Sequence, residues 1–316
     1  EPRIPLDSLS ASVRWTVQPP AQPGTPSRWQ VEVRQARFAN AEAAGQLEGT
    51  WRTGDTAADR LPGHLALRGS LSRAQATAVW RYLPLTVGDD ARQYVRHAIR
   101  GGIGQDVAFE VNGQLDGFPF PNDQGGRFRV KVPIREASLD YAPAAITGDA
   151  PGVRWTPFTD MAGELAFEGQ AMVIRQARGR LGDIGQGSFV LSNVEGRIDD
   201  LAADDPVLRI GGQGEGPLHD ALTFLAASPL STHLGAVLTK AQGQGHSALR
   251  IDLAIPLNRS IDTQLKGEVT LKEKDRAGIR LGALSPTLTQ VRGRIAFTES
   301  QLQVQARAKV WGQEMV

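Results

Sequence analysis

The stretch Leu249-Arg-Ile-Asp-Leu-Ala-Ile-Pro-Leu257 alternates large apolar residues with charged or smaller ones, with a period of two. Successive side chains of a β-strand point to opposite faces of its sheet, so this pattern predicts a strand with one apolar and one polar face. Strands of a parallel sheet are buried on both faces and read as continuous apolar runs. The stretch therefore indicates an antiparallel sheet with one solvated face.

The same alternation recurs along most of the chain, and turn-forming clusters such as Asn122-Asp-Gln-Gly-Gly126 separate the expected strands. We therefore predict a mainly β protein with a long, curved antiparallel sheet. The residues that we expect on its apolar face are Val31, Val33, Leu47, Trp51, Leu65, Leu67, Phe109, Val111, Phe128, Val130, Leu165, Phe167, Phe189, Leu191, Leu249, Ile251, Leu253, Ile255, Leu265, Val269, Leu271, Ile295, Phe297, Leu302 and Val304.

Two stretches break the alternation and predict short helical inserts, at residues 73–104 and 217–246. The first reads as a helix pair that carries Trp80, Tyr82 and Leu83. The second begins with an apolar stripe that includes Leu222 and Leu225, and a further helical turn is expected from Thr232 to Leu238. Three strand-rich segments remain, at residues 1–72, 105–216 and 247–316.

A faint internal repeat appears at an offset of 130 residues, where Phe158 to Gly182 aligns with Leu288 to Gly312 without a gap. Five of the 25 aligned positions are identical, among them Thr159/Thr289, Gly163/Gly293 and Phe167/Phe297. Two amphipathic hairpins can match this well by chance. If the repeat is genuine, it indicates one structural unit used more than once along an extended molecule.

The sequence gives little support to catalysis, metal binding or nucleic-acid binding. The 35 basic and 34 acidic residues nearly balance, whereas a nucleic-acid binder usually carries a basic excess. There is no cysteine, and the five histidines form no metal-binding motif. We therefore expect no metal, no cofactor and no enzymatic activity. An enzyme acting on glycans would need a pair of carboxylates that no motif nominates.

A glycine-rich stretch, Gly211-Gly-Gln-Gly-Glu-Gly216, superficially resembles a phosphate-binding loop. No Lys-Ser or Lys-Thr follows it, and no βαβ unit surrounds it. We therefore interpret these residues as a turn from a strand into the second helical insert.

The apolar face of such a sheet must lie against something. Three arrangements satisfy this requirement: a partner sheet in a closed sandwich, a closed barrel, or an apolar guest that is not protein. The helical inserts are too short to cover all three strand-rich segments. We therefore favour an open apolar groove that holds acyl chains, with Trp80, Tyr82, Leu83, Leu222 and Leu225 as a helical plug or rim.

Several short motifs together resemble the AsmA-like proteins of the Gram-negative envelope, specifically the YhdP branch. They are Ala78-Val-Trp-Arg-Tyr-Leu-Pro84, Tyr94-Val-Arg-His-Ala-Ile99 with Gly101, Gly113-Gln-Leu-Asp-Gly-Phe-Pro-Phe120 with Gly126-Arg-Phe128, Leu139-Asp-Tyr141, Trp155-Thr-Pro157, Ser228-Pro-Leu230 and Ile255-Pro-Leu257. Each motif is weak alone, but all occur in the expected order. Tyr94, where that branch would have Trp, and Thr156 depart mildly from the pattern.

The resemblance implies a repeating β-groove in an inner-membrane-anchored periplasmic protein that carries phospholipids between the inner and outer membranes. It implies phospholipid as the partner, together with both membranes through regions outside this chain. The chain starts at Glu1 and contains no run of 18 apolar residues, so we expect an interior portion of a longer protein. A non-transporting envelope scaffold with a closed β-sandwich is the alternative. The direction of lipid flow, the headgroup preference, the energy source and other envelope partners stay open.

Overall fold

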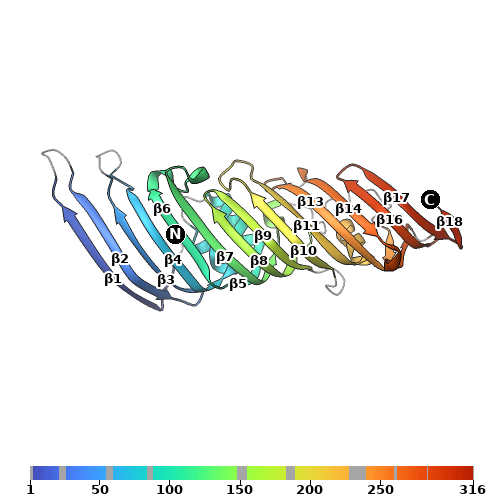
Figure 1. The fold of residues 1–316 in the computed structure, drawn as a ribbon, viewed down its shortest axis with the longest axis horizontal. Helices are drawn as coiled ribbons and strands as arrows, with labels where there is room; N and C mark the ends of the chain where they lie inside the picture. The colour runs from blue at the N-terminus through green and yellow to red at the C-terminus, as the bar shows by residue number, and fades with distance from the viewer. Residues whose placement is uncertain are drawn as a thin grey trace.

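One continuous antiparallel sheet forms the framework of the molecule (Figure 1). The structure is a computed structural model that describes residues 3–20, 26–54, 60–83, 88–147, 155–182, 189–227, 240–259, 262–282 and 284–315. Within these residues the sheet has 18 strands, which follow one another along its long axis in chain order. The prediction of a long antiparallel sheet is confirmed.

The strands are mostly between eight and 14 residues long. In the first half they are β1 (Ser8–Gln18), β2 (Arg28–Ala39), β3 (Ala43–Arg52), β4 (His64–Gln75), β5 (Ile99–Gly104), β6 (Val107–Gln114), β7 (Gly126–Leu139), β8 (Phe158–Glu168) and β9 (Ala171–Leu181). In the second half they are β10 (Val190–Ile198), β11 (Val207–Pro217), β12 (Gln242–Gln244), β13 (His246–Pro256), β14 (Gln264–Leu271), β15 (Ala277–Arg280), β16 (Leu288–Thr298), β17 (Leu302–Val310) and β18 (Gln313–Met315).

Some strand positions are filled by two short strands in succession. Both β5 and β6 pair with β4 on one side and β7 on the other, so together they occupy one position. In the same way β14 and β15 both pair with β16, while β13 and β12 pair with β14 and β15 respectively. The first helical insert leaves the sheet after β4, and the chain returns as β5 and β6, which both pair with β4. The second insert leaves after β11, and the chain returns as β12 and then β13, which pairs with β11.

The helices fall where the alternation breaks. The first insert contains a 3₁₀ helix, η1 (Ala76–Arg81), and α1 (Asp89–Ala98), and the second contains α3 (Leu218–Ala227). The expected turn from Thr232 to Leu238 lies outside the described residues. A one-turn helix α2 (Ala144–Thr147) and the 3₁₀ turns η2 (Leu115–Gly117), η3 (Pro121–Asp123) and η5 (Glu273–Asp275) were not expected.

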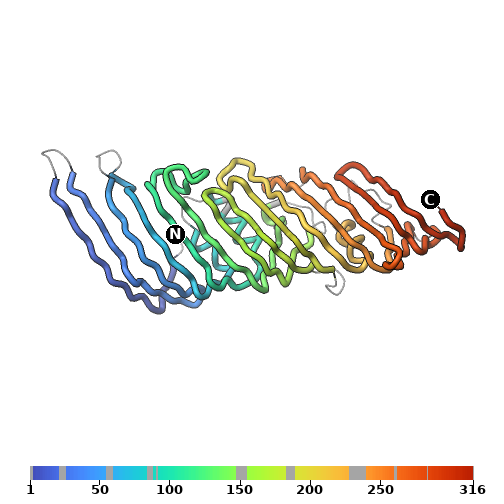
Figure 2. The backbone as a smooth tube through the Cα atoms, viewed as in Figure 1, coloured from blue at the N-terminus to red at the C-terminus, as the bar shows by residue number. Residues whose placement is uncertain are grey.

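Of these, η1, α1 and α3 lie on the apolar face of the sheet, behind the strands in the view of Figures 1 and 2. In α1 the buried side chains Tyr94, Val95 and Ala98 share one face, which joins the core cluster of the sheet. In α3 the buried residues Leu218, Ala221, Phe224 and Leu225 do the same. Hydrophobic burial therefore fixes both inserts over the centre of the sheet.

The glycine-rich stretch at residues 211–216 is not a turn, which corrects our interpretation. It belongs to β11, and α3 begins directly after the strand, at Leu218. A Cβ atom at Gly216 would lie 2.7 Å from Cα of Phe189, and one at Gly212 would lie 2.9 Å from Cγ2 of Val194. These glycines make room for neighbouring side chains on the apolar face, so their role is packing and not backbone reversal.

Candidate functional site

The polar face of the sheet carries charged side chains that pair with one another. Glu164 lies opposite Arg175 in the register of β8 and β9, with 3.3 Å between the charged groups, and it also contacts Lys131 of β7 at 2.8 Å. Asp199 contacts both Arg197 and Arg209, at 2.5 and 2.8 Å, although these two arginines oppose each other across β10 and β11. Cross-strand ion pairs of this kind neutralise the face locally.

These contacts also set the ionisation of the acids. A hydrogen bond from Lys131 is the main cause that lowers the pKa of Glu164 below its ordinary value, and one from Arg197 lowers the pKa of Asp199. Both carboxyl groups are therefore ionised at neutral pH, and neither is held in the protonated form that a general acid needs.

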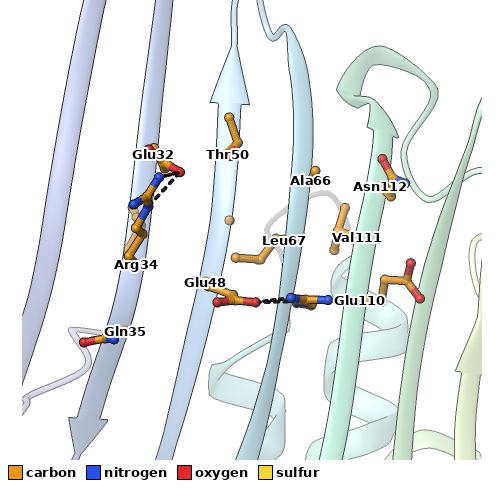
Figure 3. A pocket seen from close by; sticks show the side chains of 13 residues that line it. Glu32, Arg34, Gln35, Glu48, Thr50, Ala66, Leu67, Glu110, Val111 and Asn112 are labelled. Carbon is orange, nitrogen blue, oxygen red and sulfur yellow. Dashed lines mark hydrogen bonds and ion pairs between the residues drawn. The ribbon is translucent and has the colours of Figure 1, made fainter.

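A hollow on the polar face is likewise lined by side chains that form ion pairs (Figure 3). It lies over β2, β3, β4 and β6, and Glu32 pairs there with Arg34, while Glu48 pairs with Arg68. Among the described residues, no group of three or more His, Cys, Asp or Glu side chains could hold a metal ion. Four of the five charged side chains that line the hollow thus form ion pairs with one another.

The apolar face is the candidate functional site, because it is left open where the sheet begins. In β1, Leu9, Val13, Trp15 and Val17 are all exposed, and 70% of Trp15 is accessible to solvent. The register places Trp15 beside Val31 of β2, which in turn lies beside Trp51 of β3. Monomeric proteins rarely expose a contiguous apolar patch of this kind unless it binds something.

The strand register brings the predicted apolar residues that lie in strands to this one face, and Phe189, just before β10, is buried in the same core cluster. Rows of cross-strand neighbours, such as Val33–Gly49–Leu67–Val111, continue from strand to strand. The half-buried ones are Val31, Val33, Leu47, Trp51, Leu65, Leu67, Phe109, Val111, Phe128, Val130, Leu165, Ile251 and Ile295. The buried ones are Phe167, Phe189, Leu191, Leu249, Leu253, Ile255, Leu265, Val269, Leu271 and Phe297, while Leu302 and Val304 are exposed. Their role in binding stays a prediction.

The most exposed part of this face was not among the residues predicted from the sequence. This part consists of Leu9, Val13, Trp15, Val17 and Trp29, of which Val13, Trp15 and Val17 alternate with Arg14 and Thr16. The period-two signal was therefore present in β1. Trp311 and Met315, which are exposed at the other end of the sheet, were also missed.

The centre of the apolar face differs from the open groove that we expected, because protein covers it. From β8 to β14 most inward side chains are buried, and Ile255 of β13 is 0% exposed. Leu225 of α3 is buried in the same cluster, and Trp80, Leu83 and Leu222 pack against it as half-buried residues. Tyr82 lies apart from this cluster: its hydroxyl donates to Glu42 at 3.0 Å and accepts from Asn40 at 2.9 Å.

No helix among the described residues is long and apolar enough to cross a membrane. No solved structure matches the chain. In Escherichia coli K12, the intermembrane phospholipid transporter YhdP is 28% identical to this chain over 248 residues, which are 78% of this chain and 18% of that protein. The chain thus spans under a fifth of its relative. A model of the YhdP protein family matches residues 1–316, the entire chain, and the chain therefore belongs to the YhdP family.

Proposed function

We propose that this chain is a segment of a periplasmic lipid-transfer protein that carries phospholipids between the inner and outer membranes. The acyl chains would travel along the apolar face of the sheet while the headgroups stay in water. The single observation that carries the proposal is the continuous apolar face, open over β1 to β4. The name of the E. coli relative, an intermembrane phospholipid transporter, supports the choice of cargo. Anchoring in the inner membrane would come from regions outside this chain.

The physical basis is the cost of exposing acyl chains to water. Each exposed CH₂ group costs about 0.8 kcal/mol, so the two chains of one phospholipid cost on the order of 20 kcal/mol. A face lined by Val31, Trp51 and Leu67 offers the chains an apolar surface and removes part of that cost. No catalytic residue is needed for such a passive track.

The helices over the centre would act as a plug or rim of the track. The proposed groups are Trp80, Tyr82 and Leu83 at the first insert and Leu222 and Leu225 in α3. An acyl chain moving along the sheet from β4 towards β14 would have to pass beneath these helices or displace them, because the inward side chains there are buried.

A charge placed on the open part of the apolar face tests the proposal. Leu67 is half-buried on the apolar face of β4, and its neighbour Ala66 lies on the polar face, where it pairs with Thr50 and Asn112. In the full chain, Leu67→Asp should abolish most phospholipid binding because it sets a carboxylate against the acyl chains. Ala66→Asp, the matched control, should leave binding unchanged. Native mass spectrometry of bound phospholipid and transfer between vesicles are the measurements.

Equal phospholipid binding by a folded Leu67→Asp variant and by the control would contradict the proposed track. The scaffold is the second candidate, and the burial of the central apolar face under α1 and α3 favours it. If the chain is a scaffold, the wild-type chain and both variants should purify without lipid and should transfer none between vesicles.

A further inference from the structure

The outer side of α1 carries two arginines that have no acidic partner in the described part of the chain. Arg96 is exposed, and its guanidinium carbon lies 4.8 Å from the centre of the Trp80 ring, in a cation–π contact. Arg92 lies one turn earlier on the same side of the helix. The next arginine along α1, Arg100, differs from them because it pairs with Asp140 at 3.2 Å. Arg92 and Arg96 are therefore available to an anion.

These arginines lie at the border of the open apolar face. The helix η1, which carries Trp80, follows β4 directly and packs against α1. Its end is attached to the turn between β2 and β3, where Glu42 pairs with Arg81 and accepts a hydrogen bond from the Tyr82 hydroxyl at 3.0 Å. Contacts thus run from the β2–β3 turn through η1 to Arg96, at the place where the open face meets the first helical insert.

The strands of the open face present no charge to a lipid. Four rows of cross-strand neighbours cover β3, β4 and β6 on that face, namely Trp51–Leu65–Gly113, Gly49–Leu67–Val111, Leu47–Gly69–Phe109 and Gly45–Leu71–Val107. Every member is apolar or a glycine, whereas the ion pair of Glu48 and Arg68 lies on the polar face. Because α1 lies on the apolar face, Arg92 and Arg96 bring positive charge to the side of the sheet where acyl chains would lie.

A phospholipid fits an apolar surface that is bordered by unpaired cations. Its acyl chains match the four rows, and its phosphate group carries a negative charge next to those chains. A guanidinium group binds phosphate oxygens through the N–H donors at its edge, and stacking one of its faces on an indole leaves that edge open. Arg96 is exposed, so a phosphate bound there stays in water, in agreement with the proposed function.

We propose that Arg96, stacked on Trp80 and supported by Arg92, binds the phosphate group of a phospholipid whose acyl chains lie on the open apolar face. This inference rests on the proposed function and assigns the residues that hold the headgroup. All phospholipids share the phosphate, so the site separates phospholipids from uncharged lipids. It also orients each lipid, with the headgroup on the side of the first helical insert.

The test compares two lipids with the same acyl chains, phosphatidylethanolamine and diacylglycerol, of which only the first carries a phosphate. The full chain is mixed with each lipid in detergent, and bound lipid is measured by native mass spectrometry. Arg96→Gln should weaken the binding of phosphatidylethanolamine about fivefold, the upper range for one exposed ion pair. The same variant should bind diacylglycerol as the wild-type chain does, because the apolar rows are unchanged.

Arg37→Gln is the matched control for the change in net charge. Arg37 is exposed on the polar face of β2, since its neighbours Ala36 and Phe38 pair with Leu47 and Gly45 of the apolar rows. This variant should bind both lipids as the wild-type chain does. Glycerophosphoethanolamine, the headgroup without acyl chains, is a further arm. It should not displace the lipid, because it gains nothing from the apolar face.

Three outcomes would overturn the inference. They are unchanged binding of phosphatidylethanolamine by Arg96→Gln, an equal loss in Arg96→Gln and Arg37→Gln, and displacement of the lipid by glycerophosphoethanolamine. The first means that Arg96 does not hold the phosphate, the second that only net charge matters, and the third that the site takes a soluble phosphate. Each spares the proposed function as long as the wild-type chain binds diacylglycerol. If the wild-type chain binds neither lipid, the inference and the proposed function both fail.

Discussion

At the scale of single residues, glycines on the apolar face lie beneath large side chains of the neighbouring strand. A Cβ atom at Gly69 would overlap the ring of Phe109, and one at Gly267 would overlap the ring of Phe297. Each ring therefore lies over the backbone of the next strand and covers it where a side chain is missing.

Gly69→Ala should therefore destabilise the fold by about 1–3 kcal/mol, because the added methyl group overpacks the apolar layer. The new Cβ would also lie 2.6 Å from the backbone oxygen of Gln46, which cannot move aside as easily as a side chain. Urea unfolding measures the change in free energy. Gly282→Ala, where nothing lies within 4 Å of the new Cβ, is the control and should be nearly neutral. Equal stability of the two variants would contradict this packing account.

At the scale of elements, β-bulges recur across the sheet. Neighbouring strands β7 to β10 each contain a non-glycine residue with positive φ, namely Glu136, Asp160, Gln176 and Asn193. The strand register shifts next to each of them. A bulge adds one residue to one strand of a pair and increases its bend and twist. Four bulges on adjacent strands therefore bend the sheet along one line.

A β-bulge also occurs in both copies of the internal repeat. The strands β8 and β16 begin exactly 130 residues apart, at Phe158 and Leu288, and each is followed by a hairpin partner. Asp160 in β8 and Gln290 in β16 hold the same position and have nearly equal φ angles, 51° and 52°. The first strands of the two hairpins thus carry a bulge at the same position, which favours a genuine repeat over chance similarity.

The bulge in β16 can be tested at Gln290. Gln290→Val should cost about 1–2 kcal/mol, because a β-branched residue is strained in the left-handed region. Gln290→Gly should be neutral or slightly stabilising, because glycine adopts a positive φ without strain. The free energy of unfolding in urea measures both variants. If the two variants unfolded alike, the left-handed conformation at this position would be refuted.

At the scale of the whole molecule, the sheet is a single layer whose apolar face is open at the ends and covered in the centre. The exposed Trp15 lies in β1, whereas Trp155 is buried beneath the helices. This difference arises because the helical inserts that contain α1 and α3 branch off near the middle of the sheet and pack over it there.

Fluorescence quenching by acrylamide should report this arrangement in the lipid-free chain. The chain has six tryptophans. Trp15→Phe should lower the fraction of fluorescence that acrylamide quenches, because it removes an accessible indole. Trp155→Phe should raise that fraction, because it removes a shielded one. Opposite changes would show that the helical cover does not shield Trp155.

The sequence by itself determined the alternation of the strands and the position of the helical inserts. Leu249 to Leu257 and Val31 to Val33 specify their sheet faces locally, because side-chain direction in a strand depends only on residue parity. The same reasoning would have found Trp15, had β1 been recognised.

Only the tertiary structure decided which part of the apolar face is sheltered. Ile255 and Val31 look alike in the sequence, yet Ile255 is buried in the core cluster that includes α3 and Val31 stays partly open. The rings of Tyr141, Trp155 and Phe224 also become neighbours only through folding, because they come from separate segments. Burial is a property of contacts between distant parts of the chain, and no local pattern encodes it.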